Sequence, residues 1–209
     1  MSRIALFGGS FDPPTIGHAA TARNVLKSGL VDQLRFVPVG TDRYDRSVVA
    51  SAEQRRAMVE LFVAETFPND PRVAIESVQL DGRLPGSATI DLVEYLKLRE
   101  PENTFFFVIG GDNIKKVGEW RDYAKLIQAV RFLAVPRMGE PIPQDIPSAV
   151  TVIEGGELSG ASSSAVRQLL SLGESPAGLL TPNVAAFIRA SNLYRSGALP
   201  FEGVSRPAK

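Results

Sequence analysis

The feature that most constrains this chain is a strand that stops at a glycine-rich turn and re-forms as a helix. The apolar run Ile4–Phe7 leads into the turn Gly8–His18, and a helical pattern starts at Ala19. Such a junction leaves free backbone N–H groups at the positive end of the helix, where a phosphate can bind. His18 lies where its imidazole can donate a hydrogen bond or a charge to a phosphate oxygen. The glycine spacing matches neither the dinucleotide-binding loop nor the Walker-type loop.

The rest of the chain alternates apolar runs with segments of helical period, which is typical of parallel strands joined by crossover helices. Further strands are expected at 34–39, 73–76, 104–109, 131–135 and 150–153. Helices are expected after Ser51, after Thr89 or Ser87 as the cap, and at 120–130, 163–172 and 182–192.

This pattern predicts a doubly wound α/β protein, a parallel sheet with helices on both faces. We expect one domain over residues 1–209, with the C-terminal helices from about 160 packing on the sheet. Ligands in such folds bind at the carboxyl ends of the strands, where the strand order reverses. The turn Gly8–His18 and the segment Gly110–Asp112, which follows the longest apolar run, should therefore face each other.

Composition excludes several classes of function. The 209 residues carry 23 basic and 23 acidic side chains, without a long basic stripe, which argues against a nucleic acid polymer as partner. The chain has no cysteine and one histidine, His18, which excludes disulfides, thiolate nucleophiles and a His-cluster metal site. No apolar run is long enough to span a membrane and no signal peptide is apparent, so we expect a cytoplasmic protein without a membrane partner. Whether it forms a homo-oligomer is left open.

Two motifs resemble the signatures of the (H/T)xGH nucleotidylyltransferase superfamily. Residues Thr15–His18, preceded by Gly9–Pro13, resemble the first signature, and Gly160–Arg167 resembles the second, written ISSTxIR in the adenylyltransferase branch. The second motif is again a helix N-terminus, where serine hydroxyls and backbone N–H groups can hold a phosphate beside Arg167. Each motif alone is also compatible with a purely structural turn or cap. Together they imply a Rossmann-like nucleotidylyltransferase sheet.

A third feature narrows the resemblance. Gly110–Asp112 followed by Trp120 resembles the GxD…W arrangement of bacterial nicotinate mononucleotide adenylyltransferases. The segment Thr89–Leu92 resembles the TIDTL stretch of the same family, and residues 179–194 resemble its last helix. In that family the aspartate segment lies against the adenylate half and the tryptophan lies by the pyridine ring. The alternative for Trp120 is an aromatic that packs its helix onto the sheet.

The chain departs from the family pattern in three places. Thr15 replaces the first family histidine, as in the phosphopantetheine adenylyltransferases. The loop after the second strand, usually Pro-Pro-His-Lys, carries Arg43 and Arg46 instead, which leaves open what replaces the lysine. The family's Ser-Tyr-Thr reads Ser87–Thr89 with alanine in the middle. We expect the acceptor to contact four side chains, namely Thr89, Trp120, Arg43 and Arg46.

The resemblance implies in-line attack of an acceptor phosphate on the α-phosphorus of ATP, with release of pyrophosphate. His18, Thr15 and Arg167 are the expected catalytic residues, and no covalent nucleophile is needed. Mg²⁺ should arrive on ATP, because no carboxylate cluster forms a cage for it, and Asp12 should brace the turn. The expected ATP contacts are Gly8, Gly9, Ser10, Phe11, Gly17, His18, Gly110, Asp112, Ser162, Ser163, Ser164 and Arg167.

Three alternatives remain open at this point. The acceptor can be nicotinate or nicotinamide mononucleotide, which differ by a carboxylate against an amide. Another phosphomonoester such as phosphopantetheine is the second alternative, favoured by Thr15. The third is a non-catalytic nucleotide-binding relative, which would release no pyrophosphate.

Overall fold

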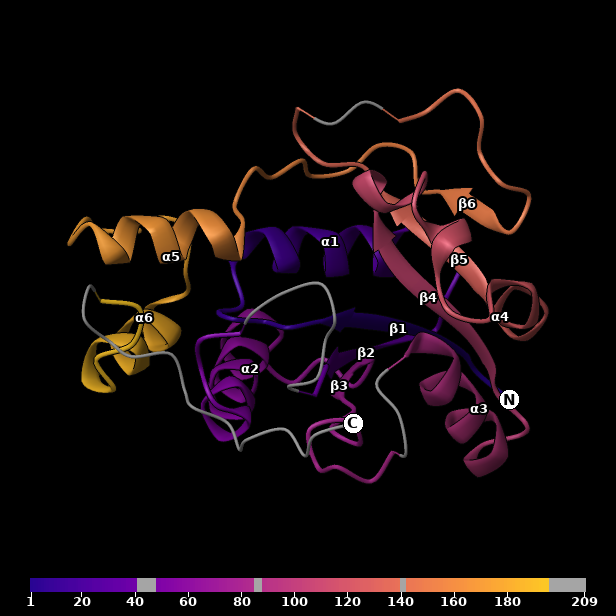
Figure 1. Ribbon diagram of the computed structural model, residues 1–209, viewed down its shortest axis with the longest axis horizontal. Coiled ribbons are helices and arrows are strands. Elements are labelled where there is room, and N and C mark those ends of the chain that lie inside the picture. Colours follow the sequence, from indigo (N-terminus) through magenta and orange to yellow (C-terminus); the bar gives the residue numbers. More distant parts are fainter. Residues whose placement is uncertain (41–47, 85–87, 140–141, 196–209) are drawn as a thin grey trace, which may run out of the picture.

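The computed structural model describes residues 1–40, 48–84, 88–139 and 142–195 (Figure 1). In this part of the chain, six strands form one sheet in the order β3-β2-β1-β4-β5-β6, and every pair is parallel. The strands are β1 (Arg3–Gly9), β2 (Gln33–Pro38), β3 (Val73–Ile75), β4 (Thr104–Gly110), β5 (Arg131–Val135) and β6 (Val150–Val152). The doubly wound parallel sheet expected from the sequence is confirmed.

The strand order reverses between the two central strands, β1 and β4. Leu6 of β1 pairs with Arg35 on one side and with Phe107 on the other. Because the strands are parallel, Gly9 and Gly110 lie at the same edge of the sheet, at the ends of neighbouring strands. Doubly wound folds bind their ligands at this switch point.

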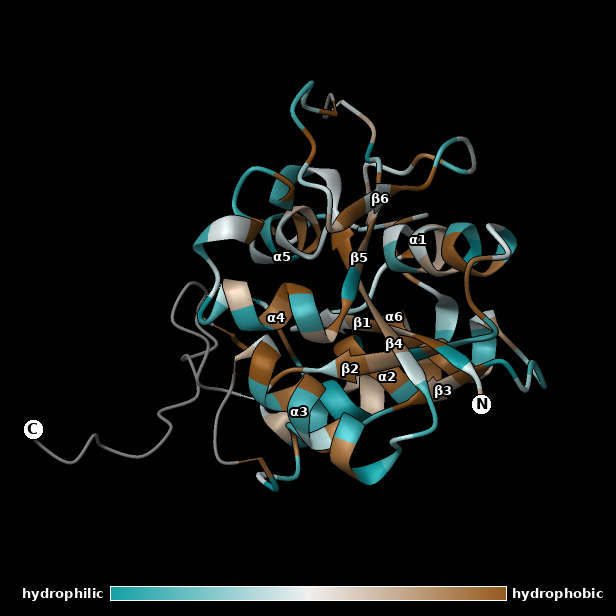
Figure 2. Cartoon of the chain, turned by 90° about the vertical axis from the view of Figure 1, so that its right-hand side faces the viewer, coloured by the Kyte–Doolittle hydropathy of each residue, from teal (hydrophilic) through white to brown (hydrophobic). Residues whose placement is uncertain are grey.

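Helices cover both faces of the sheet. They are α1 (Ile16–Lys27), α2 (Ala52–Thr66), α3 (Thr89–Arg99), α4 (Tyr123–Ala129), α5 (Ser163–Ser171) and α6 (Pro182–Ala190). One apolar cluster joins the sheet to α1, α2, α5 and α6 through residues such as Val25 and Phe36. The other joins it to α3 and α4 through residues such as Leu6 and Leu96. Figure 2 shows these hydrophobic residues, in brown, along the strands and on the helix surfaces turned toward them.

The two C-terminal helices lie beside each other at one end of the molecule, in orange and yellow in Figure 1. Val166 of α5 and Val184 and Ile188 of α6 are buried in the same cluster as the first two strands, and α6 packs against α2. The backbone N–H of Ile16 also donates to the carbonyl oxygen of Leu179 at 3.0 Å. The C-terminal segment is thus packed close to the start of α1.

Several boundaries differ from the sequence-based expectation by one to three residues, and three of them are helix starts. Helix α1 begins at Ile16 rather than at Ala19, so Ile16–His18 belong to the helix and not to the turn. The helix expected from Trp120 begins at Tyr123 instead, because Trp120 is extended (φ −69°, ψ 147°) and Asp122 is left-handed (φ 53°). Thr89 is the first residue of α3 rather than its cap, and Ala88 is the N-cap. The alternative cap, Ser87, lies outside the described residues. Among the described residues, no helix is both long enough and apolar enough to cross a membrane.

Candidate active site

A cavity of about 1090 Å³ lies at the carboxyl edge of the sheet, at the switch point between β1 and β4. Its walls come from the β1–α1 turn, the end of β4, the start of α3 and the segment that leads into α5. Thirteen of the expected site residues line it: Gly8, Gly9, Ser10, Gly17, His18, Thr89, Gly110, Asp112, Trp120, Ser162, Ser163, Ser164 and Arg167. The two helix N-termini that carry the two motifs therefore open into one space.

His18 occupies the N-terminal turn of α1, packed against Phe7 and Phe11 with ring centroids 5.9 and 5.0 Å away. The backbone N–H of Thr15 donates to its Nδ1 at 2.9 Å, so a neutral ring carries its proton on Nε2. Burial, followed by the positive charge of Arg137, lowers the pKa of His18 to about 3. Without a bound anion, the ring is a neutral hydrogen-bond donor rather than a cation.

Two residues expected at the site do not line the cavity. Thr15 is fully buried as the N-cap of α1, where its hydroxyl lies 3.0 Å from Nδ1 of His18 and 3.3 Å from the carbonyl oxygen of Ala161. An N-cap side chain turns back toward its own helix, so this hydroxyl supports the imidazole instead of facing a ligand. Phe11 is buried beneath Gly9 and packs edge-on against His18. Thr15 and Phe11 therefore contact the ring of His18 and do not line the cavity themselves.

Asp12 braces the turn, as expected. Its buried carboxylate accepts the N–H groups of Val49 and Ala50 at 2.8 and 3.1 Å and the hydroxyl of Tyr194 at 2.6 Å. The backbone carbonyl oxygen of Asp12 accepts a hydrogen bond from Nη1 of Arg167 at 2.7 Å. One residue of the turn therefore holds three distant segments of the chain.

The second motif is joined to the first by direct hydrogen bonds. Ser163 donates to the carbonyl oxygen of Pro13 at 2.8 Å, beside the bond from Arg167 to Asp12. Ser162 is the N-cap of α5 and accepts from the backbone N–H of Ala165 at 3.2 Å. These bonds fix the N-terminus of α5 against the β1–α1 turn.

The opposite end of the cavity is aromatic. Trp120 lies edge-on to Phe107 and Phe132, with ring centroids 5.7 and 5.8 Å away. The start of α3 faces the same end, and its N-cap, Ala88, has no side chain that could cap the first N–H groups, although Asp91 of the first turn accepts the N–H of Ala88. The N–H groups at the start of a helix that lack a side-chain cap can bind an anionic group.

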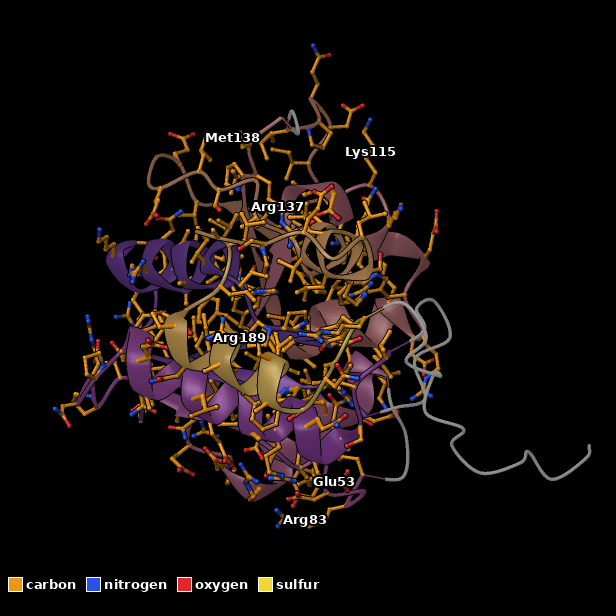
Figure 3. All side chains as sticks on the ribbon, turned by 90° about the vertical axis from the view of Figure 1, so that its left-hand side faces the viewer. Glu53, Arg83, Lys115, Arg137, Met138 and Arg189 are labelled. Carbon is orange, nitrogen blue, oxygen red and sulfur yellow. The ribbon has the colours of Figure 1, made fainter. Side chains whose placement is uncertain are left out.

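Arg137 is a cavity residue that the sequence reasoning missed. It is partly buried and lies beside Gly110, and none of the described carboxylates pairs with it (Figure 3). Its neighbour Met138 points outward instead. Its position just after β5, at the ligand-binding edge of a parallel sheet, is the signal that could have revealed it. Asp112 also carries a buried Oδ1 without a hydrogen-bond partner in the described structure.

Two expected acceptor contacts, Arg43 and Arg46, lie outside the described residues. Among the residues that are described, no group of three or more carboxylate or imidazole side chains is arranged to hold a metal ion.

A sheet of this strand order, with two helix N-termini around one cavity at the switch point, is typical of a nucleotide-binding α/β protein. Residues 6–169 match the cytidylyltransferase-like family. The chain belongs to this family and, within it, to the nicotinate-nucleotide adenylyltransferases, so the resemblance read from the motifs is confirmed.

Curated relatives support this assignment, and a solved structure supports the fold. A probable nicotinate-nucleotide adenylyltransferase of Halalkalibacterium halodurans is 33% identical, over 94% of this chain and 93% of the relative. Its counterpart in Shouchella clausii is 35% identical, over 93% and 97%. The fold is similar to that of Plasmodium falciparum nicotinic acid mononucleotide adenylyltransferase complexed with NaAD, with a TM-score of 0.79 and 22% identity over 93% of this chain and 98% of that one.

Proposed function

We propose that this chain, acting as one unit, transfers AMP from ATP to nicotinate mononucleotide. An oxygen of the acceptor phosphate attacks the α-phosphorus, the bond from that phosphorus to the bridging oxygen breaks, and pyrophosphate leaves with the electron pair. One observation carries the proposal: His18, Arg167 and Trp120, from three separate segments, line a single cavity. The full-length similarity to nicotinate-nucleotide adenylyltransferases supports the same reaction.

The two helix N-termini would bind different parts of the triphosphate. Nε2–H of His18 would donate to a phosphate near the α-phosphorus, while Arg167 and the residues Ser162–Ser164 would bind the departing pyrophosphate. Preorganised donors of this kind lower the barrier by stabilising charge as it develops. Mg²⁺ would be bound mainly by the phosphates of ATP, neutralising their charge, since the described residues offer no cage for it.

Features of the acceptor end favour nicotinate over nicotinamide. A pyridine ring can lie against Trp120, and its carboxylate would meet the N-terminus of α3 near Thr89, where the first N–H groups have no side-chain cap. An amide lacks the charge that this helix end attracts. Arg137 can bind a substrate phosphate, and the unpaired Oδ1 of Asp112 can accept from a ribose hydroxyl. Thr15, the residue that favoured phosphopantetheine, is buried and does not line the cavity, so it would not contact the acceptor.

Pyrophosphate release tests this function directly. The full chain would be assayed with ATP, Mg²⁺ and, in turn, nicotinate mononucleotide, nicotinamide mononucleotide and phosphopantetheine. We expect nicotinate mononucleotide to give the highest kcat/KM, by about tenfold or more over its amide. A preference for phosphopantetheine would overturn the acceptor assignment. No pyrophosphate with any acceptor would instead favour a nucleotide-binding relative without catalysis.

A further inference from the structure

Asn24 is a buried polar residue of α1 that the proposed chemistry does not use. It is 3% exposed, and its side chain pairs with both backbone groups of Glu157. Nδ2 donates to the carbonyl oxygen of Glu157 at 2.9 Å, and Oδ1 accepts from the N–H of Glu157 at 3.0 Å. Gly156 is left-handed (φ 97°), and a methyl group there would collide with the Asn24 amide. The contact is therefore specific in both hydrogen bonding and shape.

The same segment meets α1 at a second point. The carbonyl oxygen of Ala161 lies 3.3 Å from the hydroxyl of Thr15 and leaves no room for a side chain at Gly17. From Thr15 to Asn24 the helix advances about 13 Å, at about 1.5 Å per residue. From Glu157 to Ala161 an extended chain spans about the same length, at about 3.3 Å per residue. Residues 157–161 therefore run along α1 with little spare length between the two contacts (Figure 1).

This extended segment forms a wall of the cavity. Glu157, Ser159 and Ala161 line the cavity, and the chain passes directly into the N-cap of α5. In the described structure, the backbone N–H and C=O groups of residues 158–160 make no hydrogen bond to the protein. Unpaired backbone groups therefore lie just ahead of the start of α5, in the segment through which Ser159 lines the cavity.

We infer that Asn24 is a positioning residue for ATP: by fixing Glu157, it holds the cavity wall that contacts the nucleotide. This role rests on the proposed function, because it assigns the end of the cavity near α5 to ATP and the end near Trp120 to the acceptor. Without the two hydrogen bonds between Asn24 and Glu157, residues 157–161 would be held less firmly, and only the end of the cavity near α5 would be affected. The affinity for ATP should then fall while the affinity for the acceptor stays.

The substitution Asn24→Asp tests the inference. It keeps the size of the side chain and the acceptor for the Glu157 N–H, but it places an oxygen against the Glu157 carbonyl oxygen. We expect KM for ATP to rise about tenfold, with KM for nicotinate mononucleotide unchanged within about twofold. Gly156→Ala should produce the same pattern from the other side of the contact. Because the two changes disturb one contact, the double variant should show less than the product of the two effects.

The matched control is Asn103→Asp. Asn103 also joins two segments, accepting from the N–H of Ser2 at 2.9 Å and donating to Glu100 at 3.0 Å, but it lies at the opposite edge of the sheet. The Asn103→Asp variant should have a lower midpoint of thermal unfolding than wild type, and its KM values for ATP and for the acceptor should be unchanged. An equal rise of both KM values in the Asn24 variant, or a lower midpoint with unchanged KM for ATP, would overturn the role.

Direct binding separates this inference from the proposed reaction. The Kd for ATP is measured by calorimetry on wild type, Asn24→Asp and Gly156→Ala, without an acceptor. If wild type released no pyrophosphate, the proposed function would fail, yet weaker ATP binding in both variants would still support the positioning role. Should Asn24→Asp fail to fold, Gly156→Ala decides, and an unchanged Kd in that variant contradicts the inference.

Discussion

At the scale of single residues, His18 shows how packing sets the chemistry of a side chain. Two phenylalanine rings and the N–H of Thr15 surround the imidazole, and Arg137 adds a positive charge nearby. Burial of the imidazole, followed by the charge of Arg137, lowers its pKa and favours the neutral ring. In the proposed reaction, the positive charge that binds phosphate would come from Arg167, Arg137 and the helix ends, while His18 would contribute an oriented hydrogen bond.

The pKa of His18 can be measured without assignment, because the chain has one histidine. We expect the Cε1–H resonance of the untagged native protein to stay constant from pH 8 to pH 5. A midpoint near the ordinary value of about 6.5 would contradict the neutral ring. The unfolded chain takes up this proton below that pH and the native state does not. The stability contributed by the neutral ring is thus complete above pH 6.5 and is lost as the pH falls toward 3.

The pH dependence of the free energy of unfolding is a second measure of the lowered pKa of His18. His18→Gln removes the titrating group and keeps a polar side chain. Between pH 6.5 and pH 4 its free energy of unfolding should fall less steeply than that of wild type. Parallel curves in urea titrations over this range would show that the native ring takes up its proton normally.

At the scale of elements, the site depends on how closely α1 approaches the segment before α5. Gly17 allows this approach, because a Cβ there would overlap the carbonyl oxygen of Ala161. The contact sets the spacing between the two helix N-termini that face the cavity. A glycine near a helix start otherwise costs stability relative to alanine, by about 0.5–1 kcal/mol. Its presence at this position is explained by the approach.

Gly17→Ala should therefore destabilise the protein despite the better helix propensity of alanine. We expect a loss of about 1–3 kcal/mol in the free energy of unfolding and at least about a tenfold loss in kcat/KM. Urea unfolding and the pyrophosphate assay measure the two effects. The control is Gly118→Ala, where a methyl group meets open space. If both variants behave like wild type, the close approach does not govern the site.

At the scale of the whole molecule, the end of the described chain closes back on its beginning. The hydroxyl of Tyr194 donates to Asp12, whose carboxylate also receives the two N–H groups ahead of α2. Burial, and then the charge of Asp12, raises the pKa of Tyr194 well above its ordinary value, so its hydroxyl remains a donor. The β1–α1 turn is thus stabilised by the segment ahead of α2 and by the end of the described chain.

Tyr194→Phe removes this donor and leaves a buried carboxylate with less support. We expect the free energy of unfolding to fall by about 1.5–3 kcal/mol, the range for hydrogen bonds to charged groups. Tyr123→Phe is the matched control, because its hydroxyl makes no hydrogen bond within the described structure. A Tyr194 variant as stable as the Tyr123 variant would show that the contact contributes little.

Prediction from the sequence succeeded where the signal is local and periodic. The apolar run expected at 104–109 is strand β4, and both motifs start helices as expected. It failed where the outcome depends on partners far along the chain. The sequence from Trp120 onward predicts a helix that starts at this residue. In the structure, Trp120 packs on Phe107 and Phe132 and its backbone is extended. Thr15 and Phe11 belong to the motif, but only packing shows that they lie behind His18.

The amino-acid sequence alone determined the class of fold, the family and the two helix starts that carry the motifs, because each follows from residue spacing along the chain. Only the tertiary structure decided which side chains line the cavity, that burial and Arg137 lower the pKa of His18, and that Asn24 pairs with Glu157 of the cavity wall. These properties arise from burial and from contacts between residues distant in the chain. Neither can be read from the order of residues until the sheet has brought them together.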